Sequence, residues 1–222
     1  MSTSAELYAE ARQHMVDSQI RPNRVSDPRV LAAMRRIPRE RFVPATVQAL
    51  AYADDDVPLG NGRYLTEPMV LARMLQASPL RANERVLIVG AATGYSAAVL
   101  ADCGCRVVAL EEDPALLAIA NAVLPDEAPS VTLVAGPLAE GWPSHAPYDL
   151  ILIEGAVPEV PESLKAQLHQ ERGRLLAAIC APDEATHAIL AEATPAGLGI
   201  TPVFDCNTPP LPSLQKAPVF EF

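Results

Sequence analysis

The chain has 222 residues, of which half are apolar and 20% are charged, so it is long enough for a globular domain with one extensive core. Its formal net charge of -10 and pI of about 4.8 supply no basic face for phosphates, which argues against nonspecific nucleic-acid binding. No apolar run approaches the roughly 20 residues of a membrane helix, and the N-terminus lacks a signal-peptide pattern, so we expect a cytoplasmic protein with no membrane partner.

The N-terminal part of the chain has a helical pattern. From residue 7 to about residue 53, apolar residues recur at intervals of three to four, and Pro28 stands where the first turn of a helix accepts proline. The stretch 35–41, "RRIPRER", contains four arginines. It is interpreted as the solvated end of a helix, because most charge runs face water.

The next stretch, "VPLGNGRYLTEP" (57–68), is predicted to be a stiff polar loop, preceded by solvated acids at 54–56. Pro68 then opens a helical run, "EPMVLARMLQAS" (67–78). By residue type, Thr66 or Glu67 lies near the cap of that helix.

From residue 81 the pattern alternates between apolar strands and helices. Strands are predicted at 85–90, 105–113, 130–136, 148–155, 173–180, 186–194 and 199–204, and helices at 93–104, 114–124 and 161–170. This alternation predicts an α/β fold with a doubly wound, mostly parallel, seven-stranded sheet buried on both faces. The last two strands have no helix between them, which favours an antiparallel hairpin at one edge.

Three segments follow from this pattern: an N-terminal helical segment with the loop (1–80), a core (81–205) and a proline-rich tail (206–222). The tail is predicted to be either an extended arm packed by Phe220 and Phe222 or a partly ordered end. The oligomeric state is left open by the sequence.

The four cysteines and four histidines do not form a metal-site pattern. No CxxC pair or nearby histidine cluster completes a set of ligands, so the cysteines are interpreted as buried, inert thiols and no metal is expected.

A glycine turn and an acid suggest a nucleoside site. The first strand after residue 81 runs into "GAATGY" (90–95), a turn into a helix whose amides can face a ligand. The second strand ends at Glu111, and an acid about 20 residues beyond such a turn can accept both hydroxyls of a ribose. The spacing alone leaves nucleoside binding open, because such turns are common and acids at strand ends often face water.

Longer stretches resemble one family. "MVDSQIRPNRVSDPRVLAAMRRIPRERFVP", "AYADDDVPLGNGRYLTEP", "RVLIVGAATGYSAAVLA", "APYDLILIEGAVPEVPESLKAQL" and "GRLLA" are similar, in order and spacing, to protein-L-isoaspartate O-methyltransferases. The resemblance covers roughly residues 14 to 180. It implies an S-adenosylmethionine-dependent methyltransferase fold with N-terminal helices, and methyl transfer to the side carboxylate of isoaspartyl residues in damaged proteins, which begins their repair.

The resemblance also implies roles for individual residues. The stretch matching "GNGRYLTEP" lies over the cofactor, and the hydroxyl matching Thr66 contacts the substrate carboxylate; its alternative role is a plain helix cap. The cofactor-binding residues implied are Gly90, Gly94, Tyr95, Glu111 and Gly136.

Three positions depart from the family pattern on the cofactor side. Ile88 stands where the family has an acid, Ala92 replaces the middle glycine of the turn, and Pro137 replaces an acid that faces the adenine. Ala92 costs about 1 kcal/mol if the backbone needs positive φ there. Losing two polar contacts at roughly 1–3 kcal/mol each weakens cofactor binding.

Two further departures fall at the pocket. Glu154 replaces a small or hydroxyl residue, and Arg63-Tyr64 replaces the family's Gln-Thr. Two hypotheses therefore remain from the sequence: a working carboxyl methyltransferase, which we favour, and a non-catalytic, methyltransferase-like binding or scaffolding protein with degraded cofactor motifs.

Overall fold

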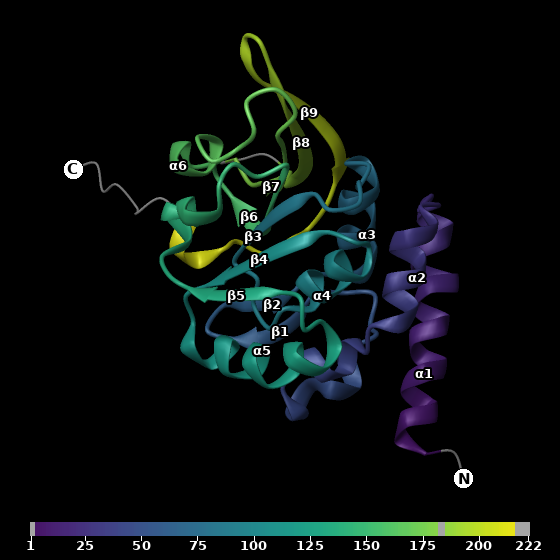
Figure 1. Cartoon of the computed structure of the whole chain (residues 1–222). Coiled ribbons are helices and arrows are strands. Elements are labelled where there is room, and N and C mark those ends of the chain that lie inside the picture. Colours follow the sequence, from purple (N-terminus) through teal and green to yellow (C-terminus); the bar gives the residue numbers. More distant parts are fainter. Residues whose placement is uncertain (1–2, 182–184, 216–222) are drawn as a thin grey trace, which may run out of the picture.

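A computed structural model describes residues 3–181 and 185–215. Its centre is a seven-stranded sheet in the order β5-β4-β3-β6-β7-β8-β9 (Figure 1). The strands are β3 (Arg85–Val89), β4 (Arg106–Glu111), β5 (Thr132–Ala135), β6 (Leu150–Val157), β7 (Arg174–Ile179), β8 (His187–Thr194) and β9 (Gly197–Asp205). The pairs among β3 to β7 are parallel, and β8 and β9 add antiparallel at one edge. The predicted sheet, including its edge hairpin, is confirmed.

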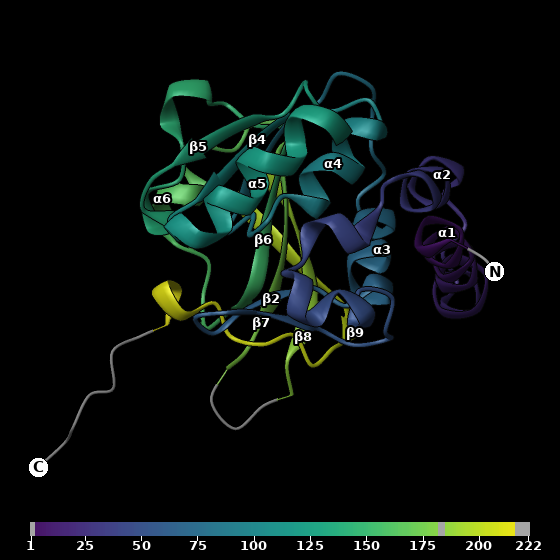
Figure 2. The same ribbon diagram turned by 90° about the horizontal axis from the view of Figure 1, so that it is seen from below.

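Both faces of the sheet are buried, because successive residues of the central strands face opposite layers. Val86 and Ile88 belong to the core that also holds the helices α2 to α5, whereas Leu87 and Val89 belong to a second core. The helices are α1 (Ser4–His14), α2 (Pro28–Arg36), α3 (Pro68–Ala77), α4 (Tyr95–Asp102), α5 (Pro114–Glu127) and α6 (Glu162–Lys165). α1 and α2 lie side by side beyond α3, at the flank of the molecule (Figures 1 and 2).

The N-terminal helical pattern is divided into short pieces. α1 runs directly into a short π-helix at Met15–Ile20. α2 begins after Asp27, whose Oδ1 accepts a hydrogen bond from the Arg29 N–H at 2.8 Å. After α2 only short 3₁₀ turns follow, at Arg39–Phe42 and Ala45–Leu50. Pro38 and Pro44 account for the breaks after α2, since a proline disfavours helix in the residue before it.

The helix predicted at 161–170 is wrong in length, because α6 covers only Glu162–Lys165. Beyond it the chain pairs with Tyr148 as an isolated parallel bridge. The Tyr148 N–H donates to the Gln167 carbonyl, and the His169 N–H donates to the Tyr148 carbonyl, both at 2.8 Å. These bonds hold residues 167–169 against Tyr148, so the tertiary pairing overrides the helical pattern of the side chains.

The predicted polar loop at 57–68 is instead a β-hairpin followed by α3. β1 (Val57–Gly60) pairs antiparallel with β2 (Arg63–Leu65). The turn residues Asn61 and Gly62 have φ of 52° and 71°, which is the backbone that Asn-Gly favours between two antiparallel strands. Burial alternates along β2, so the side chain of Arg63 points inward.

The beginning of the predicted tail pairs with the end of β6 as an isolated parallel bridge between Pro210 and Ala156. The Ala156 N–H donates to the Pro209 carbonyl, and the Leu211 N–H donates to the Ala156 carbonyl, both at 2.8 Å. A 3₁₀ turn at Pro212–Leu214 follows and lies beside the hairpin (Figure 2). Phe220 and Phe222 lie outside the described residues.

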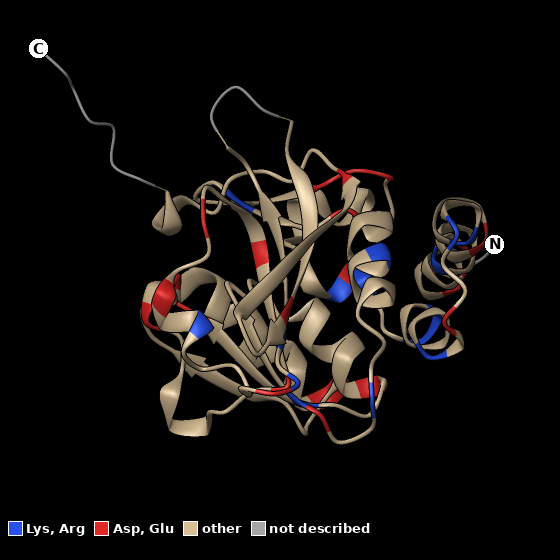
Figure 3. Cartoon of the chain, turned by 90° about the horizontal axis from the view of Figure 1, so that it is seen from above, with Lys and Arg blue, Asp and Glu red and all other residues tan. Residues whose placement is uncertain are grey.

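No helix of the described part has both the length and the apolarity to cross a membrane. In Figure 3, residues of the two charge signs are interspersed over the elements. The four cysteines are free thiols, with Cys103, Cys105 and Cys206 buried and Cys180 half-buried. Among residues 3–181 and 185–215, no group of three or more metal-ligating side chains gathers.

The glycine turn after β3 carries one strained residue. Ala92 has φ of 49°, a conformation that glycine adopts freely and that a Cβ disfavours. We expect Ala92→Gly to raise the free energy of unfolding by about 1 kcal/mol, and the melting temperature by about 2–4 °C. The matched control is Ala118→Gly on the exposed face of α5, which should lose about 1 kcal/mol. Thermal denaturation followed by circular dichroism measures both; loss of stability in the two variants alike would contradict strain at Ala92.

Candidate active site

The candidate site lies at the carboxyl ends of β3, β4 and β6, where neighbouring connections leave the sheet in opposite directions. Parallel sheets bind ligands at such a switch point. Gly90 follows β3 with φ of 75°, and its N–H and that of Ala91 donate to the Leu110 carbonyl. The glycine turn is thereby held against the end of β4, directly beside Glu111.

The Glu111 carboxylate is fully buried and surrounded by donors. The backbone N–H groups of Glu112 and Asp113 donate to Oε1 at 2.8 and 2.9 Å, and the Ala92 N–H donates to Oε2 at 2.7 Å. The left-handed conformation of Ala92 therefore belongs to the turn that delivers an amide to this carboxylate.

Arg63 completes this arrangement from the hairpin. Its Nη1 donates to Glu111 Oε1 at 2.7 Å and its Nη2 to Glu111 Oε2 at 3.0 Å. Nη2 also donates to the Gly90 carbonyl at 2.9 Å. Sequence reasoning noted Arg63 only as a departure. The alternation of inward and outward residues in the strands that flank Asn61-Gly62 could have indicated that Arg63 points inward, toward the acid.

The remaining space at these strand ends is small. The cavity lined by Arg63, Thr66, Glu154 and the segment 208–211 holds about 10 Å³, roughly the room that one water needs and far below the several hundred Å³ of a small-molecule pocket. Leu211 covers the glycine turn: its Cδ1 lies 3.3 Å from where a Cβ on Gly90 would stand. In this conformation the residues present do not fit an adenosyl group.

Thr66 lines the same cavity and is nearly buried. The N-cap of α3 is Glu67, and no side-chain hydrogen bond caps that helix. The Glu67 N–H donates instead to Asp56 Oδ1 at 2.8 Å. Asp56 is therefore half-buried and bonded, not one of the solvated loop acids predicted at 54–56, and the Thr66 side chain does not serve as the helix cap.

Arg39 holds the backbone of this segment in place. It is fully buried, so the prediction of a solvated helix end for 35–41 is wrong at this residue. Its Nε donates to the Ala51 carbonyl at 2.6 Å and its Nη2 to the Thr66 carbonyl at 2.8 Å. The guanidinium also lies 4.8 Å from the centre of the Tyr95 ring, a cation–π distance.

The other predicted site residues lie around the turn in different settings. The ring of Tyr95 is buried edge-on against Phe42, at 5.6 Å between ring centroids. Gly94 has φ of 93°, and a Cβ there would stand 2.9 Å from Leu124 Cδ1. Gly136 lies beside the acid: its N–H donates to the Glu111 carbonyl at 3.1 Å.

The positions that depart from the family pattern lie in different environments. Ile88 is fully buried in the core shared with the helices, and Pro137 precedes a 3₁₀ turn at Leu138–Glu140. Glu154 lines the cavity, where Ser96 Oγ donates to its Oε2 at 2.7 Å. Burial raises the pKa of Glu154 to about 7, and it also raises the pKa of Asp56 and that of Glu67, the latter to about 7.

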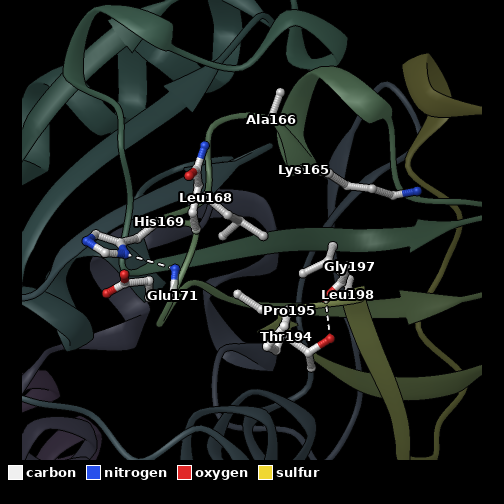
Figure 4. Close-up of a pocket in the computed structure, with 11 residues that line it drawn as sticks. Lys165, Ala166, Leu168, His169, Glu171, Thr194, Pro195, Gly197 and Leu198 are labelled. Carbon is white, nitrogen blue, oxygen red and sulfur yellow. Dashed lines mark hydrogen bonds between the residues drawn. The ribbon is translucent and has the colours of Figure 1, made fainter.

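Larger cavities lie elsewhere. One of about 660 Å³ lies between the segment after α6 and the β8–β9 turn (Figure 4). There His169 Nδ1 accepts from the Glu171 N–H at 3.2 Å, and Lys165 points away from His169. None of the predicted site residues lines this cavity, so it does not define the candidate active site.

Replacing Arg39 tests its role in the segment that carries Thr66. We expect Arg39→Met to lower the free energy of unfolding by about 3 kcal/mol, because two buried carbonyls lose their donor. The free energy of unfolding of Arg39→Lys should fall between those of wild type and Arg39→Met, since the lysine ammonium lacks the planar fork of the guanidinium. Urea denaturation measures the change. The control is Arg36→Met, whose exposed side chain pairs with Asp102 and which should cost less than about 1 kcal/mol. An equal cost would contradict a special role for Arg39.

Glu154 gives the stability a pH dependence. A raised pKa means that the folded chain keeps a proton that the unfolded chain releases, so stability is lost as pH rises from about 4.5 to about 7. We expect Glu154→Gln to remove this loss, so that its stability relative to wild type improves by about 2 kcal/mol between pH 5 and pH 8. Urea titrations at several pH values measure it. The exposed Glu171→Gln should show no such trend, and a flat difference for Glu154→Gln would contradict the assignment.

The comparisons with known proteins agree on one family for this chain. The family model described as Protein-L-isoaspartate(D-aspartate) O-methyltransferase (PCMT) matches residues 10–194. A protein-L-isoaspartate O-methyltransferase of Methylorubrum extorquens (strain PA1) is 44% identical over 174 residues, which are 78% of this chain and 76% of that protein. One of Gloeobacter violaceus is 36% identical over 198 residues, 89% of this chain and 96% of that protein.

Solved structures give the same result for the fold. A protein-L-isoaspartate O-methyltransferase superposes with a TM-score of 0.79 at 25% identity, covering 90% of this chain and 65% of the other. A Plasmodium falciparum beta-aspartate methyltransferase in complex with S-adenosyl-L-homocysteine superposes with a TM-score of 0.76 at 18% identity, covering 90% and 97%. Because the family model matches residues 10–194, most of this chain, the chain belongs to the protein-L-isoaspartate(D-aspartate) O-methyltransferase family.

Proposed function

We propose that the chain is a protein carboxyl methyltransferase that transfers a methyl group from S-adenosylmethionine to L-isoaspartyl residues of damaged proteins. Membership of the family over residues 10–194 supports this activity. The structural observation that carries it is the position of Thr66, whose side chain lines the cavity at the strand ends and does not cap α3. The same observations favour the enzyme over a scaffolding protein.

The chemistry asks little of the protein beyond positioning. The acceptor is a carboxylate with a pKa near 4, so it is already ionised at neutral pH and no general base is needed. S-adenosylmethionine supplies a methyl group that is already activated. The task of the chain is therefore to fix the acceptor oxygen, which is a matter of orientation and entropy.

Thr66 is the proposed contact for the acceptor. Its hydroxyl can donate a hydrogen bond to a carboxylate oxygen, and a bond to a charged acceptor is stronger than a neutral one. The backbone around it is fixed by Arg39 on the Thr66 carbonyl and by Asp56 on the next N–H. The backbone that carries the hydroxyl is thus held in one place before any substrate arrives.

Glu154 adjusts the charge of the same cavity. With a pKa raised to about 7 it is partly protonated at neutral pH, and a substrate carboxylate beside it favours the protonated form further. A protonated Glu154 donates a hydrogen bond to an anion instead of repelling it. The residue that departs from the family pattern is therefore compatible with an anionic acceptor.

On the cofactor side, Gly90, Gly94, Tyr95, Glu111 and Gly136 remain the predicted residues. Of these, Gly90 accepts a hydrogen bond from Arg63, which also binds the Glu111 carboxylate, and Gly136 donates to the Glu111 backbone carbonyl. The side chain of Tyr95 packs in the core. An acid at this position can hold a ribose diol, and the turn can present amides to it.

Methyl transfer to matched peptides tests the proposal. We expect labelled methyl from S-adenosylmethionine to enter an isoaspartyl peptide and not its aspartyl twin. Thr66→Ala should lower kcat/KM by at least tenfold, since one hydrogen bond to a charged group is lost. Thr66→Ser keeps the hydroxyl and should retain most of the activity.

The exposed Thr201→Ala on β9 is the matched control and should behave as wild type. Equal labelling of both peptides would reject the isoaspartyl specificity. A wild-type protein that labels neither peptide at saturating cofactor would reject the enzyme.

A further inference from the structure

We propose that Arg63 is an internal ligand of the nucleoside subsite: it occupies the Glu111 carboxylate in place of a ribose diol and sets the affinity for cofactor by competition. The inference rests on the proposed function, and it deepens it by naming the residue that limits cofactor binding. It comes from one arrangement, in which the hairpin extends a cation onto the acid at the end of β4.

The carboxylate has no acceptor capacity left. A carboxylate offers about four lone-pair sites, and Glu111 already accepts five hydrogen bonds, three from backbone amides and two from Arg63. The three amides belong to the turn and to the strand end, so they stay with the acid. The two bonds from Arg63 are those that a pair of vicinal hydroxyls would have to replace.

Arg63 fills the space beside Glu111 in addition to occupying its acceptor sites. Its planar fork reaches Glu111 and the Gly90 carbonyl together, so it lies across the mouth of the glycine turn. A Cβ on Gly90 would stand 3.1 Å from Arg63 Nη2. Arg63 is 6% exposed and Glu111 is not exposed at all, so any ligand that reaches this acid must first displace the guanidinium.

The hairpin holds Arg63 in this position through separate contacts. Asn61 Nδ2 donates to Asp113 Oδ2 at 2.7 Å, beyond the end of β4. The strand pairing places Tyr64 outward, opposite Pro58, and Arg63 inward. Releasing Arg63 therefore means either a new side-chain rotamer or a movement of the hairpin, and the two can be separated by mutation.

Arg63→Gln is the decisive variant. Glutamine is the residue that the family resemblance places here, and the variant leaves Glu111 with its three amide donors, so the buried acid keeps hydrogen-bond partners. Arg63→Lys keeps the charge but cannot form the two parallel bonds. Asn61→Gly loosens the hairpin without touching the ion pair, and glycine accepts the φ of 52° found there.

Isothermal titration with S-adenosylhomocysteine measures the competition, with melting temperatures to confirm that each variant is folded. We expect Arg63→Gln to bind at least tenfold more tightly than wild type, with Arg63→Lys between them. Asn61→Gly should stay within threefold of wild type. Hydrogen exchange gives a second readout: the ligand should increase exchange at residues 57–65 in wild type and leave it unchanged in Arg63→Gln.

Each other outcome overturns the proposal in a distinguishable way. Equal or weaker binding by Arg63→Gln, with wild type binding, would show that Arg63 is neutral or a cofactor contact, and would leave the proposed function standing. A gain in affinity for S-adenosylhomocysteine in Asn61→Gly as large as that in Arg63→Gln would assign the effect to the hairpin and not to the side chain of Arg63. No binding by any folded variant at millimolar ligand would reject both Arg63 as the limiting group and S-adenosylmethionine as the cofactor.

Discussion

A carboxylate removed from water needs partners, and in this protein that requirement organises the functional end of the sheet. Glu111 is fully buried, and an unpaired charge in that place would be prohibitive. The glycine turn, the strand end and the hairpin each contribute donors to it. Three segments distant in sequence are therefore tied to one side chain, and the shape of the pocket follows from how that side chain is satisfied.

A second buried charge performs a similar task for the substrate side. Arg39 has no carboxylate partner in an ion pair of the described residues; it binds two backbone carbonyls and lies over an aromatic ring. Because a guanidinium has five donors in a rigid fork, one residue can fix two stretches of backbone at once. This contact fixes the backbone of Thr66, so the residue proposed to meet the acceptor is placed by a buried side chain distant in sequence and not by a local helix cap.

The sheet was predictable because short apolar runs alternating with helices leave few arrangements, and all seven strands were found. The site was less predictable from the sequence. Arg63 and Glu111 are 48 positions apart, and nothing local indicates that the two meet, although alternation around Asn61-Gly62 could have turned Arg63 inward. Arg39 lies in a run of arginines whose other members are all more exposed, and nothing in the local sequence indicates which member is buried. The length of α6 was decided by pairing with Tyr148, which no helical period records.

The covering of the glycine turn by Leu211 has a consequence for how the protein matures. The sheet strands that carry Gly90 and Glu111 leave the ribosome long before residues 209–211 do, and domains begin to fold as they emerge. The strand ends at Gly90 and Glu111 can therefore be covered only once residues 209–211 have been made and have bonded to Ala156 of β6. The wall of the pocket is thus supplied by a segment that is synthesised well after the strands it covers.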